Sequence, residues 1–125
     1  MIRLVIADDE PDVCLLLELQ FGVLDDFDVV GIAGDGATAV ELCRNVRPDA
    51  LVMDLLMPSV NGFDAIDEVR ADLPDLKIVA YTGVAGNFVR DRMEQQKVPL
   101  VLKSGDVGPL ADAIRTAVRV GLGDD

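Results

Sequence analysis

The sequence predicts a single α/β domain in which helices cover both faces of an open parallel sheet. Short apolar runs alternate five times with segments of helical periodicity along the 125 residues, as in repeated strand and helix units. Half of the residues are apolar but only 4% are aromatic, so we expect a core of the aliphatic side chains typical of strands buried on both faces. This length is common for one domain.

The first half of the chain contains three strands and two helices by this reading. Proline is tolerated in a first helical turn, so Pro11 is expected to open the first helix, whose many leucines predict a largely buried element. The expected elements are a strand at Ile2–Ala7, a helix from Pro11 to about Val23, a strand at Asp28–Ala33, a turn at 34–36, a helix at Ala37–Val46 and a strand at Ala50–Met53.

The second half begins with a loop rich in turn residues, Pro58, Ser59, Asn61 and Gly62. The segment Asn87–Gln96 is only weakly amphipathic, which makes it the candidate mobile element. The expected elements are a helix at Phe63–Leu73, a strand at Lys77–Tyr81, a connection at 83–86, a helix at Asn87–Gln96, a strand at Leu100–Leu102, and a last helix with an apolar stripe at Leu110, Ile114, Ala117, Val118 and Gly121.

Strict alternation of five strands and five helices favours the flavodoxin-like, doubly wound arrangement with strand order 2-1-3-4-5. We expect the domain to span residues 1–120, with 121–125 as a tail or the start of a linker.

Charge and cysteine content limit the possible partners. The formal net charge of −12 repels phosphate backbones and anionic lipid, so direct nucleic-acid or membrane binding by this domain is disfavoured. Cys14 and Cys43 lie in helical stretches and are expected to be buried thiols, not a disulfide. No stretch has the pattern of a signal peptide or the length of a membrane span. We therefore expect a soluble, cytoplasmic protein.

Functional side chains follow the apolar runs directly. Asp8 and Asp9 come after the first strand, Asp54 after the third, Thr82 after the fourth and Lys103 after the fifth. Ligands of parallel α/β sheets collect at the carboxyl ends of the strands, and this strand order places the first and third strands side by side. Three carboxylates, a hydroxyl and an ammonium at one edge suit a hard cation and a phosphoryl group.

Four segments together resemble the receiver domain of a two-component response regulator over essentially the whole chain. They are Ile-Ala-Asp-Asp-Glu-Pro-Asp at the first strand, Val-Met-Asp-Leu-Leu-Met-Pro at the third, Tyr-Thr-Gly at the fourth and Leu-Val-Leu-Lys-Ser at the fifth.

The resemblance implies that Asp54 accepts a phosphoryl group from a histidine kinase or phosphotransfer protein. It implies that Asp8 and Asp9 hold Mg²⁺ together with Asp54 and the main-chain carbonyl of Leu56. Phosphorylation would then alter binding to a downstream output domain or protein, and the domain would not be a turnover enzyme.

By the same resemblance, Thr82 is the switch hydroxyl and Lys103 pairs with the phosphoryl group. Many receivers carry an aromatic residue three positions before this lysine, where this chain has Leu100. Tyr81 precedes Thr82 on a strand, points to the opposite face and is expected to be structural.

The Lys103-Ser104 pair resembles that of receivers joined to a LuxR-type DNA-binding domain. In such a receiver, we would look for a self-association surface on the first and last helices, which makes a homodimer possible. The chain fits either a stand-alone receiver or the receiver part of a longer regulator.

Leu56 and Val84 border the path of attacking water in this family, and both are apolar here. We therefore expect slow loss of the phosphoryl group.

Other acidic residues have simpler roles. Glu10 and Asp12 are expected to cap the first helix, and Asp35, Asp49 and Asp106 are expected to serve in turns or caps.

Three other functional classes are open to comparison. A phosphotransferase of the haloacid dehalogenase type needs a second carboxylate two residues after its nucleophile, where this chain has Leu56. A flavin or nucleotide module needs a first loop that cradles phosphate, which Asp8, Asp9 and Glu10 would repel. The alternative that stays open is a receiver-like interaction module that works without phosphorylation.

Overall fold

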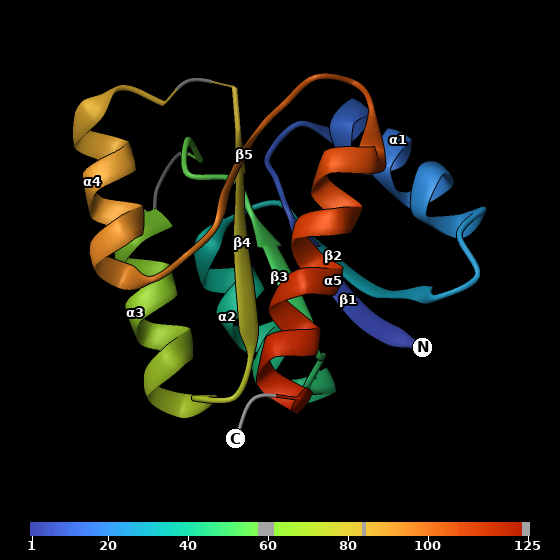
Figure 1. The fold of residues 1–125 in the computed structure, drawn as a ribbon, viewed down its shortest axis with the longest axis horizontal. Helices are drawn as coiled ribbons and strands as arrows, with labels where there is room; N and C mark the ends of the chain where they lie inside the picture. The colour runs from blue at the N-terminus through green and yellow to red at the C-terminus, as the bar shows by residue number, and fades with distance from the viewer. Residues whose placement is uncertain (58–61, 84, 124–125) are drawn as a thin grey trace.

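The computed structural model describes residues 1–57, 62–83 and 85–123, and these form five parallel strands and five helices in alternation (Figure 1). The strand order is β2-β1-β3-β4-β5, which confirms the predicted fold class. The strands are β1 (Ile2–Ala7), β2 (Phe27–Ala33), β3 (Ala50–Met53), β4 (Lys77–Thr82) and β5 (Leu100–Leu102). The helices are α1 (Pro11–Gly22), α2 (Gly36–Val46), α3 (Gly62–Asp72), α4 (Asn87–Gln96) and α5 (Val107–Gly123).

The element boundaries differ from the prediction by one or two residues, as is usual at helix and strand ends. Thr82 is the last residue of β4 and does not follow it. Helix α5 continues to Gly123, so residues 121–123, predicted as a tail, are helical. A glycine weakens a helix by only about 1 kcal/mol, which does not suffice to end α5. The predicted turn residues Pro58, Ser59 and Asn61 lie outside the described residues.

Two hydrophobic layers hold the helices against the sheet. Helices α2, α3 and α4 pack on one face and α1 and α5 on the other (Figure 1). Side chains alternate along the strands, so each strand contributes to both layers. Val5 and Ala7 pack in the layer under α2, α3 and α4, whereas Leu4 and Ile6 pack in the layer under α1 and α5. Cys43 and Cys14 are free, buried thiols in opposite layers, as the sequence predicted.

Helix α1 is less buried than its leucines suggested. It buries Cys14, Leu17 and Phe21, whereas Leu15 and Leu19 are 56% and 62% exposed. The prediction was wrong because only one stripe of a helix with 3.6 residues per turn can face the sheet, and three consecutive leucines cannot share that stripe. Among the described residues, every helix is too short or too polar to cross a lipid bilayer.

Candidate phosphoacceptor site

The sheet brings the predicted functional residues to its carboxyl edge. The parallel register pairs Ala7 with Met53, so Asp8 and Asp54 leave neighbouring strands at the same level. The main-chain N–H of Asp54 donates to the carbonyl of Ala7 at 2.9 Å. Between β4 and β5, the N–H of Lys103 donates to the carbonyl of Thr82 at 2.9 Å. This bond continues the hydrogen bonding of the two strands one residue past the end of β5.

The Lys103 ammonium joins the two buried carboxylates. Its Nζ lies 2.8 Å from Oδ2 of Asp8 and 3.3 Å from Oδ2 of Asp54. The side chains of Asp8 and Asp54 are 2% and 4% exposed, against 18% for Lys103. Two anions so poorly solvated need a cation between them, and in this structure Lys103 supplies it.

Each carboxylate is also oriented by the backbone two residues further on. Oδ1 of Asp8 accepts the N–H of Glu10 at 2.9 Å, and Oδ1 of Asp54 accepts the N–H of Leu56 at 3.0 Å. One oxygen of each carboxylate is therefore fixed by a main-chain donor while the other faces Lys103. For Asp54 this leaves Oδ2 as the atom available to react once the ammonium turns away.

Burial and charge shift the proton affinities in this cluster. The pKa of the Asp54 carboxyl is raised, first by burial and then by the charge of Asp8, although the Leu56 N–H and Lys103 oppose the shift. Burial lowers the pKa of Lys103, but the hydrogen bond to Asp8 and the fields of both aspartates outweigh it and raise this pKa to about 12. Burial, and secondly Asp8, also raises the pKa of the Cys14 thiol.

A group of carboxylates beside this cluster fits a divalent cation. Ligand oxygens of Asp8, Asp9 and Glu10 lie within 4.8 Å of one another, and oxygen atoms are the ligands that Mg²⁺ prefers. Asp9 and Glu10 are exposed while Asp8 is buried, so an ion here could keep several waters, as Mg²⁺ usually does. The structure thus gathers two of the predicted ligands and connects Asp8 to Asp54 through Lys103.

Glu10 is the residue that the sequence reasoning missed. It occupies the cap position of α1 but makes no side-chain cap hydrogen bond. Its carboxylate lies 3.6 Å from the Lys103 ammonium, and it belongs to the same acidic group as Asp9. The available signal was the unbroken Asp-Asp-Glu run after a strand, in which a third carboxylate stays close to the first two.

The remaining predicted residues surround this cluster. Thr82 is fully buried at the end of β4, and Leu56 is 58% exposed. Tyr81 packs in the layer under α1 and α5, whereas its neighbour Ala80, two residues before Thr82, packs in the opposite layer. Because side chains alternate along a strand, Tyr81 and Thr82 point to opposite faces. Leu100 also packs against the layer that contains Ala80. Val84 lies outside the described residues.

Two of the predicted capping or turn residues, Asp35 and Asp106, are confirmed, whereas the prediction that Glu10 caps α1 was wrong. Asp35 caps α2 by accepting the N–H of Thr38 at 2.8 Å, and Asp106 accepts the N–H of Gly108 at 2.9 Å in the first turn of α5. Asp49 instead accepts the N–H of Arg3 at 2.8 Å, because the loop before β3 runs alongside the start of β1.

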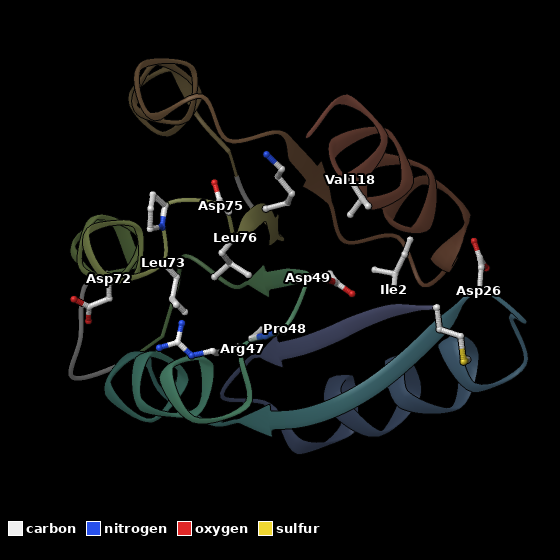
Figure 2. Close-up of a pocket in the computed structure, with 13 residues that line it drawn as sticks. Ile2, Asp26, Arg47, Pro48, Asp49, Asp72, Leu73, Asp75, Leu76 and Val118 are labelled. Atoms are coloured by element: carbon white, nitrogen blue, oxygen red, sulfur yellow. The ribbon is translucent and has the colours of Figure 1, made fainter. Parts of the chain in front are cut away.

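A groove of about 930 Å³ lies at the opposite, amino-terminal edge of the sheet (Figure 2). Ile2 and Lys77, the first residues of β1 and β4, line it together with the loops around Asp49 and Asp75. The acidic residues predicted from the strand ends are absent from its lining. The chemistry therefore concentrates at the carboxyl edge and not in this groove.

The chain matches known proteins of one family. Residues 4–115 match the family model of the response regulator receiver domain. The chain is 31% identical over 115 residues to the response regulator protein VraR of Staphylococcus saprophyticus, covering 91% of this chain and 55% of that protein. It is 32% identical over 120 residues to the transcriptional regulatory protein LiaR of Bacillus subtilis, covering 95% and 57%. The chain thus spans about half the length of these relatives.

Solved structures show the same fold. A two-component response regulator of the LuxR family from Aurantimonas sp. superposes with a TM-score of 0.87 at 27% identity, covering 94% of this chain and 85% of that one. The response regulator domain of CheB from Thermotoga maritima gives 0.83 at 25% identity, covering 96% and 98%. These relatives do not favour a receiver-like module that works without phosphorylation. One of these structures is thus a regulator of the LuxR family, and the chain itself belongs to the response regulator receiver domains of two-component systems.

Proposed function

We propose that Asp54 accepts a phosphoryl group from a partner histidine kinase or phosphotransfer protein. The observation that carries this proposal is the pairing of the buried Asp54 carboxylate with Asp8 and Lys103 at one sheet edge, within 3.3 Å of a shared ammonium. We propose that Asp8, Asp9, Asp54 and the main-chain carbonyl of Leu56 hold Mg²⁺. When bound, this ion would supply positive charge against the repulsion between the carboxylates and the incoming phosphoryl oxygens.

In the proposed transfer, Oδ2 of Asp54 attacks phosphorus and forms an O–P bond while the N–P bond to the donor histidine breaks. The product is an acyl phosphate on Asp54. Lys103 then pairs with a phosphoryl oxygen in a charge-assisted contact, which its position beside Oδ2 of Asp54 supports. Receiver domains are in general not turnover enzymes, and we propose that this chain also acts as an acceptor that can lose its phosphoryl group to water.

The signal would leave the site through Thr82. We propose that its hydroxyl donates to a phosphoryl oxygen and that Gly83, Gly86 and helix α4 follow this movement. Helix α4 places only Met93 among its residues fully in the core, so a shift of this helix would disturb little of the deep core. The movement would change the surface of α4, β5 and α5 and so the affinity for an output domain or protein.

One relative, LiaR of Bacillus subtilis, is a transcriptional regulatory protein. We therefore propose that the output is transcriptional and is carried by a segment or partner other than this domain. The net charge of −12 of this chain opposes contact with nucleic acid.

We also propose a cytoplasmic location. Both cysteines are free thiols, which supports a reducing setting.

We further propose that the chain forms a homodimer through α1. Leu15, Leu19 and Val23 are 56%, 62% and 79% exposed and follow one another at a spacing of four residues, so they form an apolar stripe along one side of the helix and its end. A second copy offers the same stripe about a twofold axis. Sedimentation equilibrium of the chain and of Leu19→Glu tests this: a dimer in the first and a monomer in the second support it, and equal masses contradict it.

Incubation with acetyl phosphate and Mg²⁺, followed by intact mass, tests the proposed acceptor. We expect one phosphoryl adduct on the parent chain, and no adduct on Asp54→Asn or when EDTA replaces Mg²⁺. Asp75→Asn, an exposed aspartate in the loop before β4, is the matched control and should behave as the parent. An adduct on Asp54→Asn would contradict the proposal.

A further inference from the structure

A single side chain on α1 reaches the loop that follows Lys103. The amide nitrogen Nε2 of Gln20 donates to the main-chain carbonyl of Gly105 at 3.0 Å, across 85 positions of sequence. A carbonyl oxygen can only accept, so the donor must be the amide nitrogen of the glutamine. Gln20 is half-buried, and this bond ties α1 directly to the connection between β5 and α5.

The loop is held at both ends, with this bond between them. At one end the N–H of Lys103 donates to the Thr82 carbonyl at 2.9 Å. At the other end Asp106 accepts the N–H of Gly108 at 2.9 Å at the start of α5. Gly105 has a φ of +83°, a conformation that side chains disfavour. The carbonyl that Gln20 binds thus lies two residues from the phosphoryl-pairing lysine.

Helix α1 is a firm support for such a bond. Leu17 and Phe21, on either side of Gln20, are 2% and 0% exposed in the core. Near the other end of the helix, the Cys14 thiol donates to the main-chain carbonyl of Asp8 at 3.3 Å. The same helix therefore contacts the acidic strand end and the loop after Lys103, which form two sides of the site.

We propose that Gln20 is a positioning residue for Lys103, which it acts on through the Gly105 carbonyl. A lysine has a flexible four-carbon stem, so the position of its ammonium depends on where the backbone places its Cα. Loss of the Gln20 bond frees the loop to shift, and the ammonium then spends less time at Oδ2 of Asp54. This inference rests on the proposed function of Asp54 and Lys103.

The proposal separates two properties of the site. The proposed metal ligands come from the ends of β1 and β3, whereas the hydrogen bond of Gln20 reaches the loop after β5. The incoming phosphoryl group is expected to pair with Lys103, whereas Mg²⁺ competes with this ammonium for the carboxylates. Removing the Gln20 donor should therefore slow phosphorylation and weaken the binding of a phosphoryl analogue, while the affinity for Mg²⁺ alone does not fall. A purely structural role in folding would affect neither, or both together.

Three substitutions and one control make the test. Gln20→Met keeps the length and removes the donor, Gln20→Glu replaces the donor by an acceptor, and Gln20→Lys keeps an N–H donor of similar reach. Gln95→Met removes an exposed glutamine on α4 and serves as the matched control. Isothermal titration measures the affinity for Mg²⁺ alone and, with Mg²⁺ present, for beryllofluoride. Intact mass measures the rate of phosphorylation by phosphoramidate, and thermal unfolding confirms that each variant is folded.

We expect Gln20→Met and Gln20→Glu to bind beryllofluoride and react with phosphoramidate about three- to tenfold more weakly, the range that one hydrogen bond supplies. Their Mg²⁺ affinity should equal or exceed that of the parent, because a displaced ammonium competes less with the ion, and Gln20→Lys should recover most of the lost beryllofluoride affinity. If Gln20→Met bound beryllofluoride and reacted with phosphoramidate as the parent does, this inference would be overturned while the proposed function would stand. Equal losses of Mg²⁺ and beryllofluoride affinity would have the same consequence. A parent chain that takes no phosphoryl group would overturn the proposed function, and this inference with it.

Discussion

The ammonium of Lys103 lies 3.3 Å from Oδ2 of Asp54, an aspartate whose side chain is only 4% exposed. The lysine thus neutralises the proposed acceptor and occupies its Oδ2. In the proposed transfer, a phosphoryl donor displaces this contact, and the same ammonium is then in place to pair with the transferred group. The resting contact and the proposed phosphorylated contact differ by a movement of one side chain.

Replacing Lys103 by methionine should destabilise the protein when no divalent ion is present. The substitution leaves Asp8 and Asp54 buried without their shared cation, which we expect to cost about 2 kcal/mol in the free energy of unfolding. Urea denaturation in EDTA measures this loss. Mg²⁺ should restore more stability to Lys103→Met than to the parent, because it no longer competes with the ammonium.

Lys97→Met, at an exposed lysine after α4, is the control and should change stability by less than about 0.5 kcal/mol. If Lys103→Met were as stable in EDTA as this control, the ammonium would not be the cation that makes the two aspartates tolerable.

Replacing Asp54 by asparagine should stabilise the metal-free protein, and increasingly so as the pH rises. The raised pKa of Asp54 means that the folded state holds this proton more tightly than the unfolded state. The parent therefore loses stability as the pH rises from the ordinary carboxyl value of 3.8 through the raised pKa. Asp54→Asn has no such proton to lose, so its stability advantage over the parent should grow as the pH rises through the raised pKa.

Thermal unfolding in EDTA at several pH values measures this difference as a higher Tm of Asp54→Asn. Asp75→Asn should show no growing advantage over the same pH range. A difference between parent and Asp54→Asn that shrinks with rising pH would mean that the folded protein favours the charged carboxylate.

Replacing Leu56 by asparagine should speed the loss of the phosphoryl group. Leu56 is 58% exposed beside the acceptor and has no polar atom that could orient water, whereas an amide can do so. We expect at least about a threefold faster decay, and orienting groups can supply far more. The decay of the phosphorylated mass after removal of acetyl phosphate measures the rate, with Leu56→Met as the apolar control. Equal lifetimes for the two variants would count against the role of this side chain.

Replacing Thr82 by alanine should separate phosphorylation from its readout. Thr82 is fully buried at the end of β4, and its hydroxyl is proposed to move only after the phosphoryl group arrives. We expect Thr82→Ala to gain the phosphoryl adduct, while hydrogen exchange of α4 no longer changes on phosphorylation. Thr82→Ser keeps the hydroxyl and should retain the change. A full α4 response in Thr82→Ala would place the signal elsewhere.

Much of the fold could be predicted because each strand is a compact apolar run and each helix carries a separate periodicity. The strand order followed from this alternation and is confirmed. Periodicity could not show how much of α1 is covered, because this depends on which neighbours pack on it. Leu15 and Leu19 look like core residues in the sequence and are exposed in the structure.

The candidate site was predictable to a similar degree. The positions at strand ends predicted that Asp8, Asp54 and Lys103 would meet. In the structure, both carboxylates lie within 3.3 Å of the Lys103 ammonium. The Asp-Asp-Glu run was an unused signal for the contact of Glu10 with Lys103, whereas the contact of Gln20 with Gly105 was not predictable. That contact depends on where a side chain of α1 points in three dimensions, and the residue type alone carries no signal for it.

Reduction of the phosphorylated protein with borohydride tests the central claim most directly, because an acyl phosphate on aspartate is converted to homoserine at the position that carried it. After treatment with acetyl phosphate and Mg²⁺, tandem mass spectrometry of peptides should find homoserine at residue 54 and unmodified Asp8 and Asp9. Homoserine at residue 8 or 9, or none at residue 54, would show that Asp54 is not the acceptor.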